Sequence, residues 1–328
     1  MNERVVVIGA GGATGQRIAR ELASRGVLLT LAGRRPDALE PLALELGAQV
    51  TRADLTSPAA LVPDARLVVN TAGPFTRLAG DLIQACLVAR IPYVDIANEH
   101  TAIEYLLGLH QRAAAHGAVL VTGAGFGPAV TEALVLGLMK GRSGPPAAVR
   151  VAAAPSAGAI SPGVFATAAQ AAEDGAARYS GGKLVHEPLG SGARQMLLDG
   201  HAWQVIPAPV GDLETARRAS SAPDVTAYFA APGQRPGPTG VSYAYADIQD
   251  VDGTMAGSLA VLGDAMATTA AIAAAIVCRV LADEPARVAG AWTPGTLYGQ
   301  DLITDACDVT VTSADPRAIW AEQEQAAQ

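Results

Sequence analysis

The sequence predicts an α/β protein in which a Rossmann-type, doubly wound parallel sheet is interrupted by an α+β domain with a mainly antiparallel sheet. Strand-like apolar runs alternate with helical patterns about every 20 to 30 residues in the first part of the chain. From about residue 147 the pattern changes to alternating segments among Gly- and Pro-rich turns. We therefore expect residues 1–128 and about 264–328 to form one domain. The residues between them, about 129–263, are expected to form an inserted domain for substrate binding or dimerisation.

The first domain is expected to contain parallel strands joined by helices. Residues 5–8 form a β-branched run, typical of a strand that is buried on both faces of a parallel sheet. A helix is predicted over about residues 16–26, because Ile18 and Leu22 share one face and charged residues occupy the other. Further strands, with helices between them, are predicted at residues 27–32, 48–53, 67–70, 93–96 and 118–122.

The inserted part is expected to form a sheet of mainly antiparallel strands. Asp252 and Gly253 form a tight-turn dipeptide, which predicts a hairpin between residues 243–249 and 255–262. Residues 162–173 are expected to form a helix on this sheet. Other strand-like segments lie at residues 149–153, 202–206, 225–230 and 241–248.

A glycine-rich loop joins the first predicted strand to the first predicted helix. Gly9, Gly12 and Gly15 fit a GxxGxxG spacing, while Gly9 and Gly11 begin a GxGxxG. Residues without Cβ let the backbone approach a pyrophosphate, and the N-terminus of the helix presents unpaired N–H groups to it. The pattern predicts dinucleotide binding, with a tight structural turn as the alternative. The predicted contact residues of this loop are Gly9, Gly11, Gly12, Ala13, Thr14 and Gly15.

The end of the second strand indicates which dinucleotide is bound. NAD sites usually place Asp or Glu there, whereas this chain has Arg34 and Arg35. Guanidinium groups hold a 2′-phosphate through charge-assisted hydrogen bonds of about 1.5 to 3 kcal/mol each, which favours NADP(H) about ten-fold or more. The alternative is that both arginines only solvate a loop. Asp54, at the end of the third strand, is expected to lie near the adenine or to cap a helix at Ser57.

Composition and charge argue against several classes of partner. Half of the residues are hydrophobic and 16% are charged, which is typical of a globular chain. The net charge of −8 and the lack of clustered basic residues argue against nucleic acid. Cys86, Cys278 and Cys307 share no metal-ligand spacing, so no metal is expected. Residues 265–278 are too short to span a bilayer and no signal-peptide pattern is present, so we expect a cytoplasmic protein without membrane contact.

Two further segments at predicted strand ends resemble those of a known family. They are Asn70-Thr71-Ala72-Gly73-Pro74-Phe75 and Tyr93-Val94-Asp95 with Asn98-Glu99. Together with the glycine loop, residues 123–128 and Trp292-Thr293-Pro294, they resemble the saccharopine dehydrogenase-like NADP-dependent reductases, including saccharopine reductase-like and trans-acting enoyl reductase-like proteins. The resemblance covers nearly the whole chain in order. In that family an α+β substrate domain interrupts a Rossmann domain, and the final helix and tail return to the Rossmann side.

The resemblance implies an NADP-dependent oxidoreductase with a small-molecule substrate. We expect reduction of a C=N (imine) bond of a small metabolite. The alternatives are reduction of an enoyl C=C bond in a lipid- or polyketide-like substrate, and a non-catalytic NADP(H) sensor. A homodimer is one option for its assembly. By family position, the residues that would line the cofactor beside the nicotinamide are Asn70, Thr71, Ala72, Gly73 and Pro74.

Tyr93, Asp95 and Glu99 are the residues predicted to carry catalysis. A carboxylate such as Asp95 or Glu99 would stabilise a positively charged iminium. An enolate would instead call for a donor such as the Tyr93 hydroxyl or His100. The alternative for all four residues is a hydrogen-bonded strand end and helix cap.

Tyr179 and Lys183 have the Tyr-x-x-x-Lys spacing of short-chain dehydrogenases. That mechanism needs both side chains on one face of a helix. Ser180-Gly181-Gly182 is a turn sequence, which would break such a helix. We therefore interpret the spacing as a coincidence.

Overall fold

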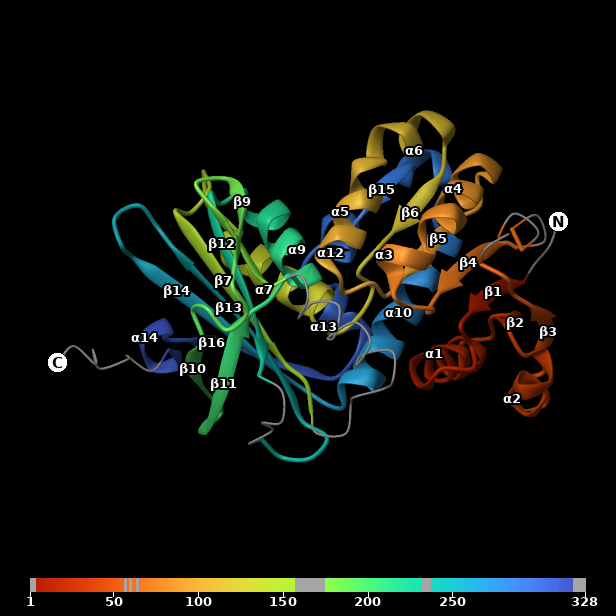
Figure 1. Cartoon of the computed structure of the whole chain (residues 1–328), viewed down its shortest axis with the longest axis horizontal. Coiled ribbons are helices and arrows are strands. Elements are labelled where there is room, and N and C mark those ends of the chain that lie inside the picture. Colours follow the sequence, from red (N-terminus) through yellow and green to blue (C-terminus); the bar gives the residue numbers. More distant parts are fainter. Residues whose placement is uncertain are drawn as a thin grey trace. The chain divides into compact units, whose positions relative to one another are not determined.

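The computed structural model describes residues 4–55, 58, 61–62, 65–156, 175–231 and 237–320. The chain forms two compact units (Figure 1). The first contains the described residues up to Gly125 and Met266–Leu297, and the second contains the other described residues. The helix expected at residues 162–173 lies outside the described part of the chain.

A seven-stranded parallel sheet forms the centre of the first unit, in the order β15-β6-β5-β4-β1-β2-β3. The chain winds outward in both directions from β1, which is the doubly wound arrangement. The predicted fold class is therefore confirmed, with β15 as a further strand. The strands are β1 (Val5–Ile8), β2 (Leu29–Gly33), β3 (Gln49–Arg52), β4 (Leu67–Asn70), β5 (Tyr93–Asp95), β6 (Val119–Val121) and β15 (Gly290–Trp292).

Helices join the strands of the first unit and bury their apolar stripes. On α1, for example, Ile18, Ala19 and Leu22 are completely buried while Arg17 is exposed. These helices are α1 (Ala13–Ser24), η1 (Pro36–Leu39), α2 (Glu40–Leu46), α3 (Phe75–Leu78), α4 (Gly80–Ala89), α5 (His100–Gly108), α6 (His110–His116), α10 (Ala265–Ala282), α11 (Pro285–Val288) and α12 (Pro294–Tyr298).

Helix α10 extends past the apolar stretch of residues 265–278 seen in the sequence and, by length and composition alone, is long enough to cross a membrane, unlike that shorter stretch. Its side chains Ile272, Ile276 and Val277 are completely buried inside the protein. A core helix of a folded domain has the same composition, so its length and hydropathy do not distinguish the two roles.

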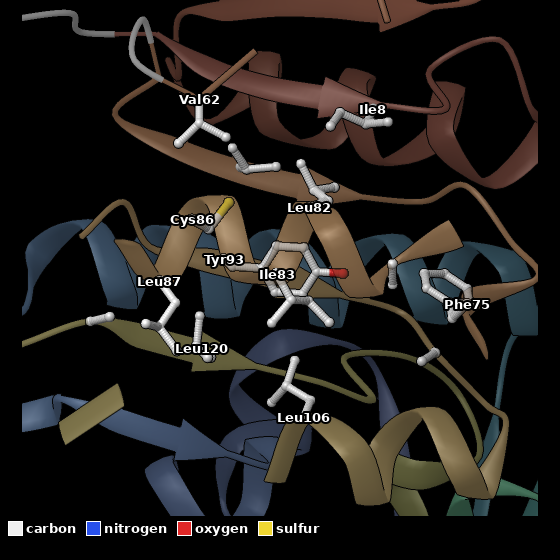
Figure 2. Close-up of a cluster of buried hydrophobic side chains, with 14 of the residues drawn as sticks. Ile8, Val62, Phe75, Leu82, Ile83, Cys86, Leu87, Tyr93, Leu106 and Leu120 are labelled. Atoms are coloured by element: carbon white, nitrogen blue, oxygen red, sulfur yellow. The ribbon is translucent and has the colours of Figure 1, made fainter. Parts of the chain in front are cut away.

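A hydrophobic cluster packs between the sheet and the helices of the first unit (Figure 2). Leu82 and Leu87 of α4, Leu106 of α5 and Leu120 of β6 are completely buried in it. Burying each such side chain stabilises the fold by about 1.5–3 kcal/mol. Tyr93 of β5 lies within this cluster, so its aromatic ring is part of the core.

The second unit is built on a mixed sheet in the order β10-β11-β12-β7-β13-β14-β16, with β8 beside β12 and β9 beside β8. Among the described strands of this second sheet, only the β12–β7 pair is parallel. The hairpin predicted at Asp252-Gly253 is confirmed, because β13 and β14 pair antiparallel on either side of it. The strands are β7 (Ala148–Ala154), β8 (Ala176–Ser180), β9 (Lys183–Glu187), β10 (Arg194–Leu198), β11 (His201–Pro207), β12 (Asp224–Ala230), β13 (Ser242–Gln249), β14 (Met255–Leu262) and β16 (Val309–Ala314).

The C-terminal segment of the chain belongs to a different unit than the sequence predicted. Residues 264–328 were all expected in the first domain, but the described residues from Tyr298 onward belong to the second unit. The reason is that β16 pairs antiparallel with β14 and extends the second sheet. Trp320 anchors the segment further, because its indole Nε1 donates a hydrogen bond of 2.6 Å to Asp247 Oδ2. The helices of this unit are α7 (Pro128–Met139), α9 (Gly211–Ser220), α13 (Leu302–Ala306) and α14 (Pro316–Ile319).

Candidate functional site

Two glycines close the loop after β1 against the end of β4. A Cβ on Gly15 would lie 2.4 Å from the carbonyl oxygen of Gly9, and a Cβ on Gly9 would lie 2.7 Å from Thr71 Oγ1. Gly9 also has a φ of +82°, a conformation that glycine adopts at little cost. Thr71 is held in place because its hydroxyl donates to the Ile8 carbonyl oxygen at 2.8 Å. These contacts explain why both positions exclude a side chain.

The outer part of the same loop is open. Gly11, Gly12 and Ala13 are exposed, and nothing lies closer than 3.4 Å to a Cβ on Gly11 or Gly12. Gly12 caps α1 without a side-chain hydrogen bond, and the first turn of α1 contains no acidic residue. The positive end of α1 is therefore not neutralised by its own side chains, and the loop fits a bound pyrophosphate.

Arg34 and Arg35 directly follow β2 and are exposed. Neither guanidinium group makes a hydrogen bond or an ion pair within the described part of the chain. Asp54 is exposed two residues after β3, and Ser57, which it was expected to cap as an alternative, lies outside the described residues. Two guanidinium groups at this strand end fit the 2′-phosphate of NADP(H).

A cavity of about 200 Å³ borders the glycine loop on the side of α1 and α2. Gln16 tightens the loop beside it, because its side-chain Nε2 donates to the Gly11 carbonyl oxygen at 3.2 Å. The cavity is lined by Ala10, Gly11, Gln16, Arg20, Ala38, Leu39, Pro41, Leu42 and Glu45.

Asn70 organises the loop that follows β4. Its side chain is completely buried; Nδ2 donates to the Tyr93 hydroxyl at 3.0 Å, and Oδ1 accepts from the Ala72 N–H at 3.0 Å. The loop then rises to the surface, where Gly73 is exposed. Asn70 therefore fixes the buried end of this turn through the Ala72 N–H.

Glu99 fixes the far end of the same loop. Its Oε1 accepts from the Phe75 N–H at 3.0 Å, and its Oε2 accepts from the Asn98 N–H at 3.2 Å. Glu99 and the following His100 are both buried. The carboxylate thus links the first residue of α3 to the segment before α5.

Asp95 joins the ends of β5 and β6. Its Oδ1 accepts hydrogen bonds from the Thr122 hydroxyl at 2.7 Å and from the N–H groups of Ala97 at 3.1 Å and Gly123 at 3.2 Å. Burial raises the pKa of the Asp95 carboxyl to about 6, although the hydrogen bonds from these three groups and Tyr93 favour the charged form. At neutral pH a negative charge is therefore held at this edge of the sheet.

Tyr93 is completely buried in the hydrophobic cluster of the first unit (Figure 2). Burial raises the pKa of its hydroxyl well above the usual value, and the negative charge of Asp95 raises it further. The hydroxyl is therefore neutral, and it accepts the hydrogen bond from Asn70. The part of Tyr93, Asp95 and Glu99 in catalysis stays a prediction.

The structure brings most of the candidate residues to one edge of the first sheet. The glycine loop, the Asn70–Pro74 loop and Asp95 all lie at the carboxyl ends of the neighbouring strands β1, β4 and β5. Thr122 was not identified as a site residue from the sequence. Its position directly after β6, at a strand end like those of the other candidates, could have indicated it. Tyr179 and Lys183 lie on opposite strands of the β8–β9 hairpin, so the predicted turn is confirmed and no shared helix face exists.

These features define a dinucleotide-binding protein of the doubly wound α/β class. Residues 5–121 match the saccharopine dehydrogenase NADP-binding domain family. This segment of the first unit is thus similar to the NADP-binding domains of that family. The resemblance seen in the sequence and the nicotinamide dinucleotide cofactor are both confirmed.

The chain is also similar to curated proteins and solved structures. Proteins named trans-acting enoyl reductase from Mycobacterium ulcerans (strain Agy99) and Mycobacterium tuberculosis (strain ATCC 25618 / H37Rv) are 32% identical over 133 residues, or 37% of this chain. The match spans 32% of each relative's own length. Saccharopine dehydrogenase (L-Glu forming) from Saccharomyces cerevisiae has the same fold, with a TM-score of 0.68 at 13% identity, over 95% of this chain and 100% of that chain.

Proposed function

We propose that the protein is an NADPH-dependent reductase of a C=N bond in a small metabolite. The observation that carries this proposal is the buried Asp95 carboxylate at the ends of β5 and β6, beside the loop that follows β4. In doubly wound sheets, ligands bind outside the carboxyl ends of the strands. A negative charge in this low-dielectric surrounding stabilises a positively charged iminium more strongly than it would in water.

Bound NADPH supplies the hydride for this reaction. The chain's own residues provide the positions and the electrostatic field. The N-terminus of α1 binds the pyrophosphate, and Arg34 and Arg35 bind the 2′-phosphate. Asn70 and Glu99 hold the two ends of the loop between them, so that its backbone stays in one conformation.

Reduction of an enoyl C=C bond is the second candidate. The name of the curated mycobacterial relatives favours it. This reaction develops negative charge on an enolate oxygen, which needs hydrogen-bond donors rather than a carboxylate. The Tyr93 hydroxyl is enclosed in the core, so another donor would have to serve. A non-catalytic NADP(H) sensor is the third candidate and differs from both by the lack of turnover.

The test is NADPH oxidation by the purified chain with two substrate panels. One panel contains imines formed from small amines with aldehydes or keto acids, and the other contains enoyl thioesters. We expect NADPH to be consumed with members of the imine panel. Consumption with enoyl thioesters alone would replace the proposal by the second candidate. NADPH binding without consumption in either panel would replace it by the sensor.

A further inference from the structure

Thr122 holds the carboxylate of Asp95 at the edge of the sheet. We propose that Thr122 is a positioning residue for the reaction: its hydroxyl fixes the orientation of Asp95 and keeps its negative charge directed at a cationic C=N acceptor. The inference rests on the proposed function, and it deepens that function by naming a residue on which a positively charged substrate depends.

The Thr122 hydroxyl donates its hydrogen bond to the Asp95 carboxylate. The side chain is completely buried, and Oγ1 lies 2.7 Å from Asp95 Oδ1, the shortest of the three hydrogen bonds to that oxygen. The backbone N–H of Thr122 is bonded to the Trp292 carbonyl oxygen at 3.0 Å, across the β6–β15 pair. The strand therefore fixes the backbone, and the hydroxyl is directed to β5.

The hydrogen bond is charge-assisted, which makes it stronger than a bond between neutral groups. The other two donors to the same oxygen are backbone N–H groups, which a change of side chain other than to proline leaves in place. Thr122 is thus a side chain through which the charge of Asp95 can be altered without changing Asp95 itself. Tyr93, the titratable neighbour that also acts on Asp95, stays neutral in its buried position.

The same contacts shape the chain that leaves β6. The Gly123 N–H binds the Asp95 side chain, and the Ala124 N–H donates to the Asp95 carbonyl oxygen at 2.9 Å. Two residues later, at Phe126, the chain enters the second unit. Asp95 and Thr122 therefore anchor the start of this connecting segment as well as the charge.

The experiment compares Thr122→Val, which keeps the shape and removes the donor, with Thr122→Ser, which keeps the donor. The first readout is the titration of the Asp95 carboxyl carbon by NMR in the cofactor-free protein. We expect a midpoint near pH 6 in the wild type, a midpoint about one unit higher in Thr122→Val, and the wild-type value in Thr122→Ser. Thr268→Val, which alters a buried threonine on α10, is the control and should leave the midpoint unchanged.

The second readout is the pH dependence of imine reduction. In Thr122→Val the acidic limb of kcat should move upward with the Asp95 midpoint, while the affinity for NADPH stays as in the wild type. An Asp95 midpoint that is the same in Thr122→Val and wild type would overturn the inference. So would a failure of Thr122→Ser to restore the wild-type value. The titration needs no turnover, so it tests the contact between Thr122 and Asp95 by itself. A wild type that reduces no imine would reject the proposed function, whatever the titration shows.

Discussion

Gly15 is the residue on which the shape of the cofactor loop depends most directly. A methyl group there would overlap the carbonyl oxygen of Gly9 and the hydroxyl of Thr71. We expect Gly15→Ala to push the loop away from β4, to lower the stability by about 1–3 kcal/mol and to weaken NADPH binding at least ten-fold. Thermal unfolding and a fluorescence titration with NADPH measure the two effects.

Gly80→Ala is the matched control for this substitution. Gly80 begins α4, and a Cβ on it would have no heavy atom within 4 Å. The stability and the affinity for NADPH should both stay close to the wild-type values. If Gly15→Ala also left the stability and the NADPH affinity unchanged, the close packing of the glycine loop on Thr71 would not control cofactor binding.

At the scale of single residues, the sequence identified the right strand ends but not the surroundings of each side chain. Residue type and position were enough to place the glycine loop, Arg34 and Arg35 at strand ends, while their contacts with the cofactor stay a prediction. The burial of Tyr93 in the core and the tie between Asp95 and Thr122 depend on strand neighbours that are far apart in the chain. No local pattern encodes such contacts, because β5 and β6 meet only in the folded sheet.

Two helices of the second unit enclose a carboxyl group between them. Asp212 of α9 is completely buried; its Oδ1 accepts from the Thr131 hydroxyl of α7 at 2.8 Å, and its Oδ2 has no hydrogen-bond partner in the described structure. Burial raises the pKa of Asp212 to about 6 from an ordinary value of 3.8. The contact between α7 and α9 should therefore depend on pH.

The direction of this effect follows from the raised pKa. The folded state binds the proton more tightly than the unfolded state, so the contribution of Asp212 to stability is fully present below about pH 3.8 and is lost as the pH rises through about 6. The loss is on the order of 3 kcal/mol, since one pKa unit corresponds to about 1.4 kcal/mol. We expect Asp212→Asn to remove this part of the decline in the free energy of unfolding between pH 4 and pH 7.

Chemical denaturation at several pH values measures the decline. The exposed Asp81 on α4 gives the control, because Asp81→Asn should keep the wild-type dependence on pH. An Asp212→Asn variant with the same slope as the wild type would show that the Asp212 carboxyl stays ionised in the folded state down to its ordinary pKa.

At the scale of elements, strands with a continuous apolar run were the easiest to predict. Residues 67–70 form β4 with the bounds that the sequence predicted. The edge strand β16 (VTVTSA) was not predicted from the sequence. Its side chains are mostly exposed, so it lacks the continuous apolar run that marks a buried strand. This strand forms because its backbone pairs with β14, which is a tertiary contact and not a local sequence preference.

The whole molecule combines a doubly wound unit, in which residues 5–121 match an NADP-binding domain family, with a second, mixed-sheet unit. Its similarity to saccharopine dehydrogenase at 13% identity shows how little of this fold depends on particular residues. The order of strands, helices and glycine turns was sufficient to predict it. The assignment of the tail to the second unit was not predictable in this way, since residues 298–320 contain short elements without a clear period.

The most direct test of the account is a titration of the whole chain with NADPH and with NADH, for the wild type and for a variant with Arg34→Ala and Arg35→Ala. We predict saturable binding of NADPH to the wild type, at least ten-fold weaker binding to the variant, and equal NADH affinity in both. Absence of measurable binding of either nucleotide to the wild type, or an NADPH affinity that the double substitution leaves unchanged, would contradict the account.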